Sequence, residues 1–188
     1  MILSSISKNF FNQIAFHISR SISDFLVIYL IAKFSNINNL GLYSFAITFS
    51  MTARLLLDLG IGLYLTREIS KYKDKVKDYV GNTLTLILII SPIILIIAYL
   101  IMYYSTNDIE RIHGVMLCMF GLIFVSFSSI FHSVFFAYEK IHLQAITITL
   151  QEILFLILVS IILITGLDFN LIFWSYFASK FISFIIST

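Results

Sequence analysis

The chain has 188 residues, of which 60% are hydrophobic and 12% are charged, and its formal net charge is +2 at pH 7. Soluble domains are about half apolar and about a quarter charged. The composition therefore excludes an ordinary soluble domain and indicates a multi-pass membrane protein. So small a positive charge gives no support for nucleic-acid binding. Cys118 is the only cysteine, which excludes an internal disulfide and a cysteine-based metal site.

Six apolar stretches have the length of about 20 residues that a helix needs to cross the hydrocarbon core. They predict transmembrane helices over residues 10–34, 42–66, 80–104, 114–137, 143–165 and 169–187. The connections are too short to hold a soluble catalytic domain. We therefore expect an all-α polytopic membrane protein with a single transmembrane domain over residues 1–188. Pro92 should kink the third helix.

Both ends of the chain bear on this assignment. The first stretch is interrupted by polar residues and has no small-residue cleavage site, so we interpret it as a retained helix rather than a signal peptide. The last stretch ends at Thr188 without a polar tail or basic stop. This favours the N-terminal part of a longer transporter, and a complete six-helix protein is the alternative.

A cluster of basic residues lies in the loop predicted after the second helix, residues 67–79. Lys8 and Lys140 fall on the same side of the membrane, whereas Lys33 and Arg111 fall on the other. Cytoplasmic loops carry an excess of Lys and Arg, so the N-terminus is predicted to be cytoplasmic. A contact with anionic lipid headgroups is an alternative role for the cluster. Its members are Arg67, Lys71, Lys73, Lys75 and Lys77.

Polar residues also recur inside the first two predicted helices. In the first helix their spacing of three or four residues places them on one face, and the members are Asn9, Gln13, His17, Arg20 and Asp24. The second helix carries Arg54 and Asp58. Charge at this depth in a membrane is costly and faces protein or water rather than lipid. The two helices therefore hold the main candidate site.

Depth estimates suggest how these charges could pair. At a rise of about 1.5 Å per residue, antiparallel packing of the first two helices brings Arg20 to the depth of Asp58, and Arg54 to that of Asp24. We therefore expect two cross-helix ion pairs beside the two pairs within the helices. The third helix carries no charge and is expected to face lipid.

A second group of intramembrane polar residues lies later in the chain. Glu152 and Lys180 have opposite charges near the middle of the fifth and sixth helices, and His132 lies among serines in the fourth. An ion pair that only holds helices together is the alternative to a substrate-binding role. For the histidine, a hydrogen bond to a neighbour is the alternative to proton relay.

The sequence shows no catalytic or cofactor motif. It has no glycine-rich phosphate loop, no metal-spaced His or Cys cluster and no arrangement of nucleophile and base. We therefore expect a protein that is not an enzyme and holds no metal or cofactor. A membrane-embedded glycosyltransferase or polymerase would need a larger extramembrane loop than any predicted here.

The runs LGLYSFAITF, DLGIGLYLTREIS and DYVGN, between residues 40 and 82, resemble the second helix and following loop of bacterial polysaccharide flippases. These are the O-antigen and capsule repeat-unit transporters of the multidrug/oligosaccharidyl-lipid/polysaccharide exporter superfamily. SSIFHSVFFAYEKIHLQAI is similar to the connection between the fourth and fifth helices in that family. The resemblance implies a two-lobe transporter, in which these six helices form the first lobe.

The resemblance also implies a substrate, an undecaprenyl pyrophosphate-linked oligosaccharide moved out of the cytoplasmic leaflet for lipopolysaccharide, O-antigen or capsule synthesis. Arg20 and Arg54 would contact the pyrophosphate. The remaining site residues would hold these arginines, bind a coupling proton or sodium ion, or contact sugar hydroxyls. They are Gln13, His17, Asp24 and Asp58. The implied location is the bacterial cytoplasmic membrane, with polysaccharide assembly proteins as partners beside the membrane lipids.

Two other functions fit the same helices. A drug or small-cation exporter of the superfamily needs a polar cavity but no pyrophosphate contact. A non-transporting assembly subunit needs no cavity, and its polar stripe should tolerate apolar replacement if packing is kept.

Overall fold

The computed structural model describes the backbone of residues 2–188, and the side chains of residue 14 and of residues 17–188. The described backbone forms seven α-helices and one short 3-10 helix, and contains no strand. The helices are α1 (Ile2–Phe34), α2 (Ile37–Asp58), α3 (Ile61–Lys71), η1 (Lys73–Lys75), α4 (Val76–Ser105), α5 (Ile109–Ala137), α6 (Ile141–Thr165) and α7 (Leu171–Ser187). The expected all-α architecture is confirmed.

Four helical segments within the described residues are long and apolar enough to cross a membrane. They are Ile37–Lys71, Lys73–Ser105, Ile109–Ala137 and Ile141–Thr165, and the shorter helix Leu171–Ser187 is also apolar. Large apolar side chains cover the outside of the bundle, such as Leu88 and Ile96 on α4. A helical bundle with such a surface satisfies its backbone internally and suits a hydrocarbon environment, so the chain is a polytopic membrane protein.

The second predicted helix, residues 42–66, is not continuous. The structure ends α2 at Asp58 and begins α3 at Ile61. Leu59 and Gly60 between them have left-handed backbone angles, with φ of 31° and 81°. Gly60 adopts this conformation readily because it has no Cβ. The sequence DLGIG held the signal for this break, but the apolar pattern on both sides concealed it.

The basic region at residues 67–79 is also more regular than expected. The prediction of a loop is wrong for most of it, because α3 extends to Lys71, η1 follows, and α4 already begins at Val76. Pairs such as Glu68 with Lys71, three residues apart at 3.7 Å, supplement the helical turn. The basic side chains are therefore held on a compact helical corner at one end of the bundle.

The bundle is organised around α5, which packs against α2, α3, α4 and α7. Two glycines of α5 allow the closest approach, to α7. A Cβ at Gly114 would lie 2.9 Å from the ring of Phe173, and one at Gly121 would lie 3.2 Å from the ring of Tyr176. Small residues at such contacts let membrane helices pack tightly. The α5–α7 contact is therefore closely packed at both glycines.

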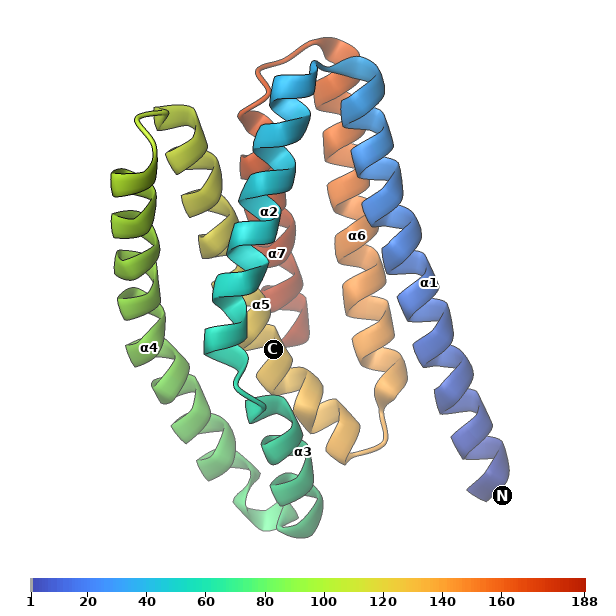
Figure 1. Cartoon of the computed structure of the whole chain (residues 1–188). Coiled ribbons are helices and arrows are strands. Elements are labelled where there is room, and N and C mark those ends of the chain that lie inside the picture. The colour runs from blue at the N-terminus through green and yellow to red at the C-terminus, as the bar shows by residue number, and fades with distance from the viewer. Residues whose placement is uncertain (1) are drawn as a thin grey trace.

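Figure 1 shows α1 and α6 side by side along one edge of the bundle, and α4 along the opposite edge. α4 includes Pro92, and its ribbon bends along its length. The connections after α1, α4 and α6 lie at one end, whereas α3, η1 and the α5–α6 connection lie at the other. We call this second end, defined by α3 and η1, the basic end.

Candidate functional site

A pocket of about 580 Å³ lies between the α1–α6 edge and the helices α2, α3, α5 and α7. Every α-helix except α4 contributes side chains to its lining. That the third predicted helix, residues 80–104 within α4, faces lipid stays a prediction. The lining extends from Asp24 and Phe155, in the middle of the bundle, to Thr66 and Gln144, toward the basic end. Three basic and two acidic side chains take part, namely Arg20, Arg54, Lys180, Asp24 and Glu152.

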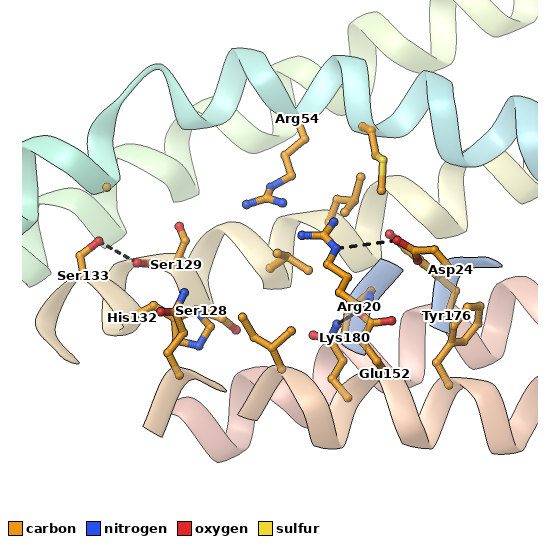
Figure 2. Close-up of a pocket in the computed structure, with 18 of the residues that line it drawn as sticks. Arg20, Asp24, Arg54, Ser128, Ser129, His132, Ser133, Glu152, Tyr176 and Lys180 are labelled. Carbon is orange, nitrogen blue, oxygen red and sulfur yellow. Dashed lines mark hydrogen bonds and ion pairs between the residues drawn. The ribbon is translucent and has the colours of Figure 1, made fainter. Parts of the chain in front are cut away.

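Arg20 and Asp24 enter the pocket from α1. Arg20 Nε lies 3.9 Å from Asp24 Oδ2, and the two side chains are 41% and 55% exposed. The distance is too long for a hydrogen bond, so the two groups attract each other while keeping most of their bonding capacity. Figure 2 shows both in the pocket, with the Arg20 guanidinium extending toward the wall that carries Arg54.

Arg54 enters from α2, on the opposite wall. Its Nη2 lies 2.9 Å from Asp58 Oδ2, one turn along the helix. Asp58 is the last residue of α2 and does not line the pocket, so it holds the arginine from outside. Arg54 Nε is buried without a hydrogen-bond partner. The side chain is 22% exposed and lines the pocket, so other N–H groups of the guanidinium can reach a ligand there.

The predicted cross-helix pairs do not form. Among the described side chains, Arg20 and Arg54 make ion pairs only within their own helices. The physical reason is the packing partner of α1, which lies along α6 rather than along α2. The prediction assumed that helices consecutive in sequence pack side by side.

Glu152 and Lys180 form the ion pair that their positions suggested. Lys180 Nζ on α7 donates to Glu152 Oε1 on α6 at 3.1 Å, and the side chains are only 8% and 6% exposed. Gln151 Nε2 donates to the same carboxylate oxygen at 2.8 Å. The lysine also lies 4.8 Å from the centre of the Tyr176 ring, a distance typical of cation–π contact. This cluster joins α6 to α7 at the inner wall of the pocket.

His132 joins three helices. Its Nε2 lies 3.2 Å from Thr147 Oγ1 on α6 and 3.4 Å from Ser187 Oγ on α7. The ring is buried and borders the pocket. Bonds to neighbouring hydroxyls were the alternative to a proton relay, and the structure shows those bonds.

Two further residues of the predicted stripe are less informative. The side chain of Gln13 lies outside the described residues. His17 is exposed and is not among the residues that line the pocket. Of the stripe residues whose side chains the structure describes, Arg20 and Asp24 line the pocket.

Sequence reasoning missed much of the polar lining. Ser133, Thr66, Gln144, Gln151, Tyr43 and Tyr176 line the pocket and were not singled out. On α5 the signal was present, because Ser129, His132, Ser133 and Phe136 follow the spacing of one helix face. The contributions of α3 and α6 depend on which helices face the same space, which local periodicity does not specify.

The arrangement can bind a polar, partly anionic group inside an apolar bundle. The guanidinium and ammonium groups provide N–H donors, and Asp24 and Glu152 provide carboxylates. No group of three or more His, Cys, Asp or Glu with metal-binding proximity occurs among the described side chains.

A comparison with protein families shows which family the chain belongs to. A family model described as polysaccharide biosynthesis protein matches residues 6–188, almost the whole chain. The chain belongs to this family. No curated protein and no solved structure matches it. Family membership agrees with the helical membrane architecture and connects the protein with surface polysaccharide synthesis or export.

Proposed function

We propose that this protein moves undecaprenyl pyrophosphate-linked oligosaccharide repeat units across the bacterial cytoplasmic membrane for O-antigen, lipopolysaccharide or capsule synthesis. The observation that carries the proposal is the pocket, in which three cationic and two anionic side chains line a space inside an apolar bundle. A sugar pyrophosphate cannot cross hydrocarbon without such a polar environment. Membership of the polysaccharide biosynthesis family supports the same role.

In this proposal Arg20 and Arg54 contact the pyrophosphate. They extend from opposite walls of the pocket, and planar guanidinium groups suit phosphate oxygens because they can donate two parallel hydrogen bonds. Each is held by an acid one turn away, which orients it and leaves other N–H groups available. The Glu152–Lys180 pair fixes the wall behind them.

Asp24 is the candidate for a coupling proton or sodium ion. It lines the pocket, it is more exposed than Glu152, and its separation from Arg20 is longer than a hydrogen bond. The transport cycle would need a second six-helix lobe, because alternating access requires one lobe to rock against another. The N-terminus would be cytoplasmic, with the basic end of the bundle at the cytoplasmic surface.

The experiment compares Arg20→Gln and Arg54→Gln in cells that depend on this protein for surface glycan. We expect each change to reduce glycan display by roughly tenfold or more, because a charge-assisted hydrogen bond is worth about 1.5–3 kcal/mol. Arg111→Gln is the matched control, since Arg111 also pairs with a nearby acid, at 3.7 Å, but does not line the pocket. It should leave glycan display unchanged.

Two results would favour the other functions. Raised drug sensitivity with intact glycan would favour a drug or cation exporter of the superfamily. Unchanged glycan and drug sensitivity after replacing Arg20 by Met would favour a non-transporting assembly subunit, because such a subunit needs packing rather than charge at this position.

A further inference from the structure

The part of the pocket toward the basic end is lined by uncharged polar groups from three helices. Thr66 comes from α3 and Gln144 from α6, whereas α5 contributes His132 and three serines, Ser128, Ser129 and Ser133. In Figure 2 these serines lie on one side of the view and the Arg20, Asp24, Glu152 and Lys180 cluster lies on the other. The pocket thus has a hydroxyl-lined end and a charged end.

The hydroxyl groups at this end all donate their hydrogen atom to a backbone carbonyl. Ser128 Oγ donates to the Phe124 carbonyl at 3.0 Å, and Ser133 Oγ donates to that of Ser129 at 2.8 Å. Ser129 Oγ and Thr66 Oγ1 likewise donate to carbonyls of their own helices, at 2.7 Å and 2.9 Å. A hydroxyl has one hydrogen and two lone pairs. Because backbone carbonyls already engage all four hydrogens, with that of Thr66 also 3.5 Å from the Ser133 carbonyl of α5, the groups have only acceptor capacity left.

The charged end has the opposite excess. Arg20 there carries N–H groups and no acceptors, and so does Arg54, which lies between the two ends in Figure 2 and whose Nε is without a partner. Glu152 and Gln144, at the two ends, are eight residues apart on α6, which corresponds to roughly 12 Å. The complementary ligand therefore has acceptor oxygens at one end and O–H donors about 12 Å away.

We infer that the hydroxyl-lined end is a subsite for the sugar portion of a glycosylated lipid pyrophosphate, oriented with its phosphates at the charged end. Phosphate oxygens accept hydrogen bonds, whereas sugar hydroxyls donate them, so the two ends of the ligand match the two ends of the pocket in order. The inference rests on the proposed function and adds the orientation and the recognition of the glycan. Ser128, Ser129 and Ser133 are then specificity-determining residues.

The test uses the full chain in lipid nanodiscs and two probes. One probe is a polyprenyl pyrophosphate without sugar, and the other is the same lipid pyrophosphate bearing a disaccharide. The variant S128A/S129A/S133A removes the acceptors from α5. We expect affinity for the glycosylated probe to fall by about tenfold or more, as for the loss of two or three modest hydrogen bonds, while affinity for the sugar-free probe stays unchanged.

The matched control is S160A/S175A/S179A. These three serines also donate to carbonyls of their own helices, and none lines this pocket. The control should bind both probes like the unmodified chain. Melting temperatures of both variants check that each remains folded, and a glycosylated probe lacking one sugar hydroxyl should lose less affinity in the pocket variant than in the unmodified chain.

The outcomes separate the two proposals. If the pocket variant binds the glycosylated probe as well as the unmodified chain does, or loses both probes equally, the sugar subsite is refuted and the proposed function remains. If the unmodified chain binds neither probe, or if R20Q and R54Q leave binding of both probes unchanged, the proposed function is refuted and the subsite with it.

Discussion

The buried ion pair between Glu152 and Lys180 allows a quantitative test of how the bundle is held together. In Lys180→Met the side chain keeps a similar length but loses its charge, and Glu152 keeps only Gln151 as a hydrogen-bond partner. Removing one member of a buried pair costs about 3–5 kcal/mol, because the other charge is left uncompensated. Loss of the contact with the Tyr176 ring adds roughly 0.5–2 kcal/mol.

The double variant Glu152→Gln/Lys180→Met makes the prediction specific. With both charges removed, no uncompensated charge remains, and replacing a buried pair by neutral side chains of similar size is often close to neutral. We therefore expect the double variant to regain most of the stability that the single lysine variant loses. The expected coupling energy is at least about 2 kcal/mol, above the roughly 0.5 kcal/mol within which independent sites add.

The assay is reversible unfolding of the purified chain in mixed micelles, followed by the fluorescence of Trp174. Trp174 is the only tryptophan and lies on α7, the helix that carries Lys180. Arg111→Met is the control, because its pair with Asp108 is about 44% exposed and such pairs contribute about 1 kcal/mol or less. Additive losses in the double variant would refute the claim that the two charges stabilise one another.

Three further predictions concern the backbone and the topology. Gly114→Ala should destabilise the chain by about 1–3 kcal/mol, because the added methyl would lie 2.9 Å from an aromatic ring of α7. Gly81→Ala is the control, because its methyl meets nothing within 4 Å and the change should be neutral or stabilising. Chemical unfolding measures the stability of both variants. Gly60→Ala should lower the free energy of unfolding by about 1–2 kcal/mol because φ is +81° at this position. An unchanged midpoint of chemical unfolding would contradict the left-handed backbone conformation between α2 and α3. In a Cys118→Ser background, Asp74→Cys on η1 should react with a membrane-impermeant maleimide only from the cytoplasmic side. Labelling of this cysteine in intact cells would contradict a cytoplasmic location of the basic end.

The pocket contains two kinds of charged pair, one buried and one exposed. Glu152 and Lys180 are nearly inaccessible and bonded to each other, whereas Arg20 and Asp24 are about half exposed and lie beyond hydrogen-bond distance. Charge that is fully satisfied stabilises the bundle, and charge with bonding capacity left can bind a ligand. Substitutions at the first pair should therefore change mainly stability, and those at Arg20 mainly binding.

Much of this protein follows from the sequence alone. Apolar stretches predicted an all-α membrane protein, and four of the described helical segments are long and apolar enough to cross a membrane. The spacing of four residues predicted the pairs Arg20–Asp24 and Arg54–Asp58, both of which are confirmed. These features are local, because a helix places residues three or four apart on one face whatever surrounds it.

Only the tertiary structure decided which charged side chains line the same pocket. The packing of α1 along α6 brings Arg20 beside the Glu152–Lys180 wall and away from Asp58. It also leaves α4 outside the lining, and the turn at Gly60 directs α3 so that Thr66 faces the serines of α5. The sequence pattern could not specify these relationships, because an amphipathic period fixes which face of a helix is buried but not which helix covers it. That choice depends on the fit of whole surfaces, such as the two glycines of α5 beneath the aromatic rings of α7.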